Sequence, residues 1–211
     1  IVVRAREFAG ALIQWKGRRF NYSAEGEKKW AVIKGNEPWH PFGGLRFYGL
    51  WPLYDIYIYK FKWSGISEDG KVVSHPAEVL DYILLKDDVY WVQVEKAEDN
   101  KLLPLDIELV LTIRVINPYR ALFNVQNWLE TIINRIKPIV RDITTQEDYE
   151  HWVRNKEAMG AQIYEKAKKP LEDFRNKYGV DIRKIQVKDI NPPSEYRERT
   201  LAPFLAEMDR R

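Results

Sequence analysis

The pattern of apolar and polar positions changes most sharply between residues 105 and 123. Up to residue 115 every second side chain is apolar, and this set consists of Leu105, Ile107, Leu109, Leu111, Ile113 and Val115. Polar residues such as Asp106 and Glu108 stand between them. A period of two predicts an antiparallel strand with one buried face and one solvated face. A helix is predicted to begin at Asn117 and Pro118, because Asn is a favoured N-cap and Pro loses only an unpaired amide at the first helical position.

The following segment carries apolar residues three or four positions apart, which is the spacing of one helix face. These residues are Leu122, Val125, Leu129, Ile132, Ile136, Ile139 and Ile143. They predict a single helix that packs against the sheet. Pro138 lies inside this pattern and removes one backbone hydrogen bond, so a kink or pause is predicted about one turn earlier.

A second helix and a further strand are predicted downstream. The sequence TTQE at residues 144–147 has the pattern of a capping box and predicts where the second helix begins. Gly179 predicts its left-handed end. Residues 180–190 then have the composition of a strand, and their apolar phase slips between Ile182 and Ile185, which predicts a bulge.

Aromatic residues mark the strands predicted before residue 105. One strand has an aromatic face formed by Tyr57, Tyr59, Phe61 and Trp63. A loop is predicted at residues 64–76 and a second aromatic strand at residues 89–94, so the arrangement is expected to be a β-meander. Residues 1–39 mix short apolar pieces with turn signals and are expected to form an irregular lead-in.

Six short segments carry a resemblance to a known family. They are LYDIYIY at 53–59, TIRV at 112–115, NPYRALF at 117–123, YGVDI at 178–182, VKDI at 187–190 and NPPSE at 191–195. In order and spacing these segments resemble the SPFH domain, the band 7 family of stomatin, prohibitin and flotillin. Together they span most of residues 45–200.

The resemblance implies an α+β fold with four consecutive parts. These are the lead-in at 1–39, an antiparallel, aromatic-rich β subdomain at 40–116, a small α/β subdomain at 117–190 and the start of a long C-terminal helix at 191–211. Two features depart from the family pattern. The lead-in is longer and more aromatic, and Pro203 falls where the terminal helix should be uninterrupted, at a cost of about 3 kcal/mol in a helix interior.

Composition excludes several classes of function. Lys and Arg number 34 against 31 for Asp and Glu, and a net charge of +3 gives no electrostatic footprint for a nucleic-acid partner. Cysteine is absent, which excludes disulfides and thiolate chemistry. No apolar run reaches the roughly 18 residues that a membrane helix needs. The chain is expected to be an excised domain whose membrane anchor lies outside it.

The loop WHPFGGLRFYGLW at residues 39–51 is the candidate functional site, because amphipathic rings suit a bilayer interface. The residues predicted to contact the membrane are Trp39, Phe42, Leu45, Phe47 and Trp51. The alternative is that these side chains pack over the edge of the sheet as a secondary core.

Catalytic and cofactor chemistry finds little support in the sequence. His40 and His75 each precede a proline, and His151 has no partner at zinc-ligand spacing, so no metal or cofactor is assigned. Asp106 and Glu108 could mimic an acid/base pair, but carboxylates on a wet strand face usually keep that face soluble. A packed sheet face explains the aromatic stripe better than a nucleic-acid platform does.

The resemblance implies a non-enzymatic scaffold at a membrane, on its cytosolic face. Its partners would be further copies of itself in a large assembly, the lipid surface and an integral membrane protein such as a protease or channel. Two alternatives stay open. One is a soluble adaptor that binds a protein through residues 39–51, and the other is a hydrolase-like enzyme whose residues converge only in three dimensions.

Overall fold

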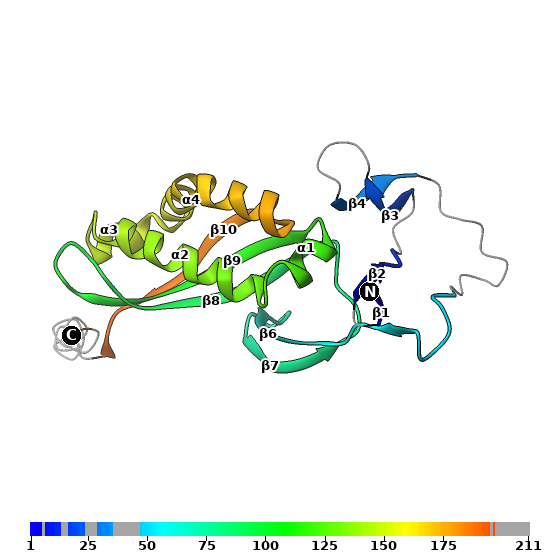
Figure 1. Cartoon of the computed structure of the whole chain (residues 1–211). Helices are drawn as coiled ribbons and strands as arrows, with labels where there is room; N and C mark the ends of the chain where they lie inside the picture. The colour runs from blue at the N-terminus through cyan, green and yellow to red at the C-terminus, as the bar shows by residue number, and fades with distance from the viewer. Residues whose placement is uncertain (6, 14–16, 24–28, 36–46, 195, 197–211) are drawn as a thin grey trace, which may run out of the picture.

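A three-stranded antiparallel sheet with helices across one face forms the body of the protein (Figure 1). The computed structural model describes residues 1–5, 7–13, 17–23, 29–35, 47–194 and 196. The strands in chain order are β1 (Val2–Arg4), β2 (Glu7–Gly10), β3 (Arg18–Ser23), β4 (Lys29–Lys34), β5 (Tyr54–Ile56), β6 (Tyr59–Ile66), β7 (Val72–Leu80), β8 (Asp87–Glu98), β9 (Pro104–Val115) and β10 (Val180–Asn191). The helices are α1 (Pro118–Phe123), α2 (Trp128–Thr144), α3 (Tyr149–Arg154) and α4 (Lys156–Tyr178). This arrangement confirms the predicted α+β class.

The central strand β9 confirms the prediction from the alternating pattern. It pairs with β8 on one side and with β10 on the other, both antiparallel. Its six apolar side chains, from Leu105 to Val115, are all buried in one cluster with α2 and α4. The predicted bulge in β10 is also present, because the register with β9 shifts between Ile182 and Lys184.

The helix after β9 begins where the sequence predicts but ends early. Asn117 is the N-cap of α1, its side chain accepts a hydrogen bond from the Arg120 N–H, and Pro118 is the first helical residue. The prediction of one helix through residue 143 is wrong, since α1 stops at Phe123 and α2 starts at Trp128. Asn127 explains the restart, because its side chain accepts from the Glu130 N–H at 3.1 Å and donates to the Glu130 carboxylate at 3.1 Å. The helix α2 runs on through Pro138, so the break lies elsewhere than predicted.

The capping box predicted at residues 144–147 is wrong. Thr144 still belongs to α2, and the Trp152 indole N–H donates to its carbonyl at 3.1 Å. Asp148 is the N-cap of the next helix instead, with its carboxylate accepting from the His151 N–H at 2.9 Å. Helix α3 is short, and α4 follows Asn155 and ends at Gly179 in the predicted left-handed conformation, with φ of 65°.

Gly179, which ends α4, contacts Asn117, which begins α1. The N–H groups of Ile116 and Asn117 donate to the Gly179 carbonyl at 2.9 and 3.0 Å, respectively. A Cβ on Gly179 would lie 2.5 Å from the Asn117 Cβ, so only glycine fits this contact. This junction fixes the start of α1 against the end of α4.

The segment expected as an irregular lead-in contains four of the strands. Strand β1 pairs with β2 and with β5, while β3 and β4 form a hairpin. Phe8 of β2 packs against aromatic rings from the hairpin and from α1. Its ring contacts, with centroid distances of 4.7–5.6 Å, are Phe20, Trp30, Tyr119 and Phe123. The N-terminal strands therefore dock on α1 through an aromatic cluster, at the right of Figure 1.

Strand β7 replaces much of the loop predicted at residues 64–76, because β6 extends to Ile66 and pairs with β7 in a hairpin. The expected meander is in fact two separate hairpins, β6–β7 and β8–β9. The aromatic face of β6 points into the core, as expected for a packed sheet face. There the Phe61 ring stacks on Trp128 of α2 at a centroid distance of 5.2 Å.

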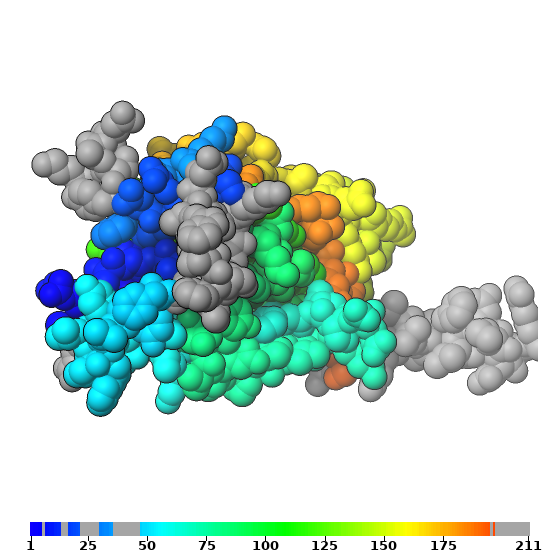
Figure 2. All heavy atoms as spheres, turned by 90° about the vertical axis from the view of Figure 1, so that its right-hand side faces the viewer, coloured from blue at the N-terminus to red at the C-terminus, as the bar shows by residue number. Residues whose placement is uncertain are grey.

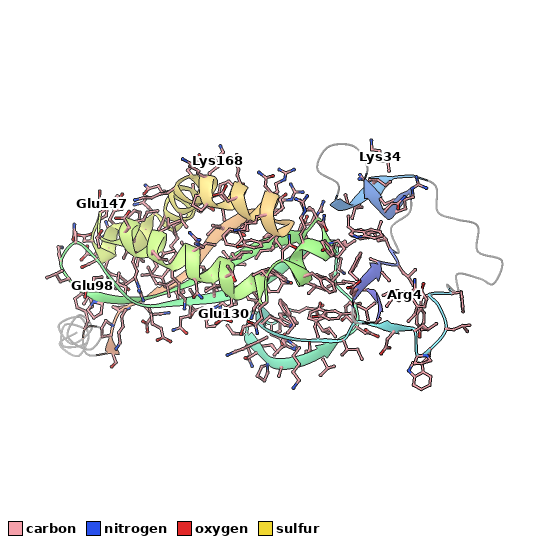
Figure 3. The ribbon with its side chains drawn as sticks, viewed as in Figure 1. Arg4, Lys34, Glu98, Glu130, Glu147 and Lys168 are labelled. Atoms are coloured by element: carbon pink, nitrogen blue, oxygen red, sulfur yellow. The ribbon has the colours of Figure 1, made fainter. Side chains whose placement is uncertain are left out.

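The tip of the β8–β9 hairpin is tied to the connection between α2 and α3. The buried carboxylate of Asp99 accepts hydrogen bonds from the N–H groups of Lys101, Leu103 and Tyr149. Lys101 also forms an ion pair with Asp148 at 2.9 Å. In Figure 3, Glu98 and Glu147 mark this end of the molecule, far from Arg4 and Lys34 at the other end.

We expect Gly179→Ala to lower the free energy of unfolding by about 3 kcal/mol, because left-handed strain of roughly 1–2 kcal/mol adds to overpacking of a similar size. Gly70→Ala is the matched control. Gly70 has a φ of 75° with open space around its Cβ position, so only the strain applies. Urea denaturation measures both variants. Equal losses would contradict a role for the contact with Asn117.

The ion pair at the hairpin tip makes stability depend on pH in the acid range. Hydrogen bonding to the Lys101 ammonium and to the His151 N–H lowers the pKa of Asp148 below its usual value of 3.8. A carboxyl with a depressed pKa stabilises the fold above its unfolded pKa, and this contribution disappears as pH falls through the folded pKa. Lys101→Met should therefore be less stable than wild type near neutral pH, and the difference should shrink at about pH 2.5. Urea titrations at both pH values check this, and a difference independent of pH would count against it.

Candidate membrane-contact site

Residues 47–53 form an exposed apolar loop just before β5, which we call the apolar loop. The exposed fractions are 80% for Phe47, 70% for Leu50, 81% for Trp51 and 61% for Leu53. In Figure 2 the cyan segment that includes this loop stands out at the lower left of the face shown. Large apolar side chains this exposed, and adjacent in one loop, mark a contact surface better than scattered single residues do.

The fold holds the apolar loop by its C-terminal end. Strand β5 pairs with β1, and the Ala5 N–H donates to the Leu53 carbonyl at 3.3 Å. The Leu50 carbonyl accepts from the N–H groups of Leu53 and Tyr54 at 3.0 and 3.1 Å, which closes a tight turn with Trp51 at its tip. Leu50, Trp51 and Leu53 are therefore displayed on a hydrogen-bonded turn.

Glycine is required at position 49 of the apolar loop. Gly49 has a φ of 132°, and a Cβ there would run into the Tyr54 ring. The Arg4 guanidinium lies over the Tyr54 ring, 5.6 Å from its centroid. Tyr54 thus connects the apolar loop to β1.

The five predicted membrane-contact residues divide into two groups. Trp39, Phe42 and Leu45 lie outside the described residues. Phe47 and Trp51 are the two most exposed large apolar side chains of the loop, and neither packs into a secondary core.

Sequence reasoning missed further exposed apolar residues beside the predicted ones. Leu50 lies inside the predicted loop 39–51, and the apolar composition of that loop already indicated a contact surface. Leu53 belongs to the segment that carries the family resemblance, and Ile58 lies between Tyr57 and Tyr59 of the predicted aromatic strand; each is 61% exposed. The apolar surface is thus larger than the sequence indicates.

The histidines considered as catalytic candidates do not come together. His40 lies outside the described residues. The His75 ring stacks on Trp63 at a centroid distance of 3.9 Å, and its Nδ1 lies 3.0 Å from a Glu78 carboxylate oxygen. His151 belongs to α3, at the other end of the sheet (Figure 1). Within the residues that the structure describes, no group of three His, Asp or Glu side chains could hold a metal ion.

Asp106 and Glu108 serve the polar face of the sheet. Asp106 accepts from the Lys96 N–H at 3.0 Å, at the bulge of β8. Glu108 accepts from the Trp91 indole at 3.1 Å and from the Lys188 ammonium at 3.2 Å. These carboxylates connect β9 to its neighbouring strands by hydrogen bonds, whereas the sequence predicted only that they keep this face soluble.

The most strongly shifted side-chain pKa values lie away from the apolar loop, in the aromatic core between β6 and β8. Burial raises the pKa of Tyr59 and of Tyr90 well above the usual value of 10. The Tyr59 hydroxyl donates to the Tyr82 carbonyl at 2.8 Å. Both phenols are neutral near pH 7 and act as packing residues.

Across the described chain, none of the helices combines the length and the apolar character needed to cross a bilayer.

No curated protein matches the chain. One family model matches, the SPFH domain / Band 7 family, over residues 48–210. This match covers the apolar loop from Tyr48 onward, the β8–β9–β10 sheet and all four helices. The chain therefore belongs to the SPFH domain / Band 7 family.

Proposed function

We propose that this domain is a non-enzymatic scaffold that rests on a lipid surface through its apolar loop. Members of the family are generally membrane-associated scaffolds. The observation that carries the proposal for this chain is that Phe47, Leu50, Trp51 and Leu53, adjacent in one loop, are each at least 61% exposed. Trp and Phe flanked by Leu are the residue types that enter the interfacial region of a bilayer.

The energy available from one apolar loop is modest. A fully buried Leu or Phe side chain gains about 1.5–3 kcal/mol, and interfacial insertion buries only part of each. Four such side chains would hold a single copy weakly. Several copies joined in one assembly would convert this into firm attachment, because each later contact is intramolecular.

The proposed scaffold therefore works as a homo-oligomer in a large assembly. It would organise a membrane microdomain or hold an integral membrane protein such as a protease or channel, on the cytosolic face, with its anchor outside this chain. The division into a lead-in at 1–39, a β subdomain at 40–116, an α/β subdomain at 117–190 and an outgoing helix at 191–211 is part of this proposal.

The docking of Phe8 on α1 refines that division. Phe8 contacts Tyr119 and Phe123 of the segment 117–190, so the lead-in acts as a brace between the apolar loop and the helices. Strand β1 completes the brace by pairing with β5 directly after the loop. The brace would transmit force between the lipid surface and the helical layer.

The two alternative functions differ from the scaffold in what the apolar loop contacts. A soluble adaptor would use the same side chains to bind a protein without lipid. A hydrolase-like enzyme would need its catalytic groups gathered in one pocket, whereas His75 and His151 belong to separate parts of the fold. The exposed loop favours a binding role over a catalytic one.

Phe47→Ser combined with Trp51→Ser should lower the partition coefficient onto anionic liposomes, measured by flotation, about tenfold, equivalent to about 1.4 kcal/mol. Leu102→Ser is the matched control. Leu102 is 74% exposed but lies at the β8–β9 tip, so flotation should be unchanged. Mass photometry of the same samples should show assemblies of many copies for all three proteins. A wild type that is monomeric and indifferent to lipid would contradict the scaffold, and protein capture through the loop without flotation would favour the adaptor.

A further inference from the structure

The strongest unassigned feature is an apolar cavity of about 700 Å³ between the N-terminal strands and the segment that joins β7 to β8. Its walls come from the start of the chain through β1, the residues after β2, Tyr48, β5 and residues 81–86, with Arg114 of β9 and Pro118 of α1. The volume lies within the roughly 300–1,000 Å³ typical of small-molecule sites. Tyr48 of the apolar loop lines this cavity, whereas Phe47, Leu50, Trp51 and Leu53 do not.

The cavity has a buried floor and an exposed apolar rim. Val2 and Ile13 form the floor, with exposed fractions of 7% and 5%. Tyr48, Tyr82 and Leu84 belong to the rim and are 38%, 55% and 40% exposed. Apolar side chains held around a hollow and left open to water gain free energy when an apolar ligand covers them.

Two cationic side chains stand among the apolar walls. Arg114 is paired with Asp87, whose carboxylate lies 2.7 Å from the arginine Nε. Lys86 also lines the cavity, is exposed, and forms no ion pair among the residues that the structure describes. Asp81 is the one acidic side chain of the lining, and Asp87 already neutralises Arg114, so Lys86 is the lining cation open to an anionic head group.

We propose that this cavity binds a free long-chain fatty acid. An alkyl chain has no hydrogen-bonding groups and so loses nothing on entering walls made mostly of Ile, Leu and Val. The carboxylate would lie at Lys86, the cation without an internal partner. A single chain suits the volume better than the two chains of a phospholipid. This proposal goes beyond the scaffold function and does not depend on it.

Segment 81–86 is the element best placed to admit the ligand. It connects β7 to β8 without regular secondary structure and supplies Ile83, Leu84 and Leu85 to the cavity wall. The Tyr82 carbonyl is held by the Tyr59 hydroxyl, which ties the segment to β6. Chain entry past the exposed rim needs no change in the core sheet.

Displacement of a dansyl-labelled fatty acid by oleate, below the micelle concentration, tests the proposal on the whole chain. We expect saturable binding, and a rise in Kd of at least about tenfold for Ala11→Phe, which fills the cavity from a small wall residue. Leu84→Trp fills it from the exposed rim, where the larger side chain is tolerated, and should have the same effect. Circular dichroism confirms that each variant is folded.

The head-group assignment has its own measurement. Lys86→Met should weaken oleate binding about fivefold, the size of a partly exposed ion pair, and leave oleyl alcohol binding unchanged. Phe47→Ser with Trp51→Ser should not alter oleate binding, and Ala11→Phe should still float with liposomes, so failure of the cavity and failure of the membrane contact are distinguishable. Absence of saturable oleate binding, or equal binding by wild type and both folded filling variants, would overturn the proposal.

Discussion

Burial of one face of β9 is the interaction on which the rest of the structure depends. Its six alternating apolar side chains are at most 5% exposed, and both of its edges are paired with neighbouring strands. A slip of one residue would put Asp106 and Glu108 into the core, so the register is strongly specified. Helices α2 and α4 cover the buried face, and the junction of Asn117 with Gly179 holds the end of α4 against the start of α1. The N-terminal strands dock on this sheet-and-helix body through α1, and they in turn hold the apolar loop through β5.

The elements with a strong local signal were predictable from the sequence. The period of two in β9, the Asn117 cap and the Gly179 stop each act within a few residues, and the structure has all three. The errors arose where a short side-chain hydrogen bond competed with a longer pattern. Asn127 restarts a helix inside an unbroken apolar stripe, and Asp148 takes the capping role from Thr144. Strand β1 pairs with the distant β5, and Phe8 of β2 packs on α1, and local sequence reveals neither of these contacts.

The sequence indicated which residue types form the candidate site but not how far the exposed apolar surface extends. An aromatic loop with Pro and Gly indicates a contact surface, and Phe47 and Trp51 are indeed displayed to solvent. The exposure of Leu53 and Ile58 was not evident from the sequence, because Leu53 precedes β5 and Ile58 follows it, so both lie outside the paired strand. The cavity beside the loop is assembled from seven separate stretches of chain, so no local pattern could have indicated it.

A spin label in the apolar loop tests the central claim, contact between this loop and lipid, most directly. The chain contains no cysteine, so Leu50→Cys provides a single labelling position, with Leu102→Cys as the exposed control at the far end. The account predicts that, on liposomes, the label at residue 50 becomes accessible to dissolved oxygen and protected from a water-soluble nickel complex, while the label at residue 102 does not change. Equal accessibility of both labels to nickel on liposomes would contradict the account.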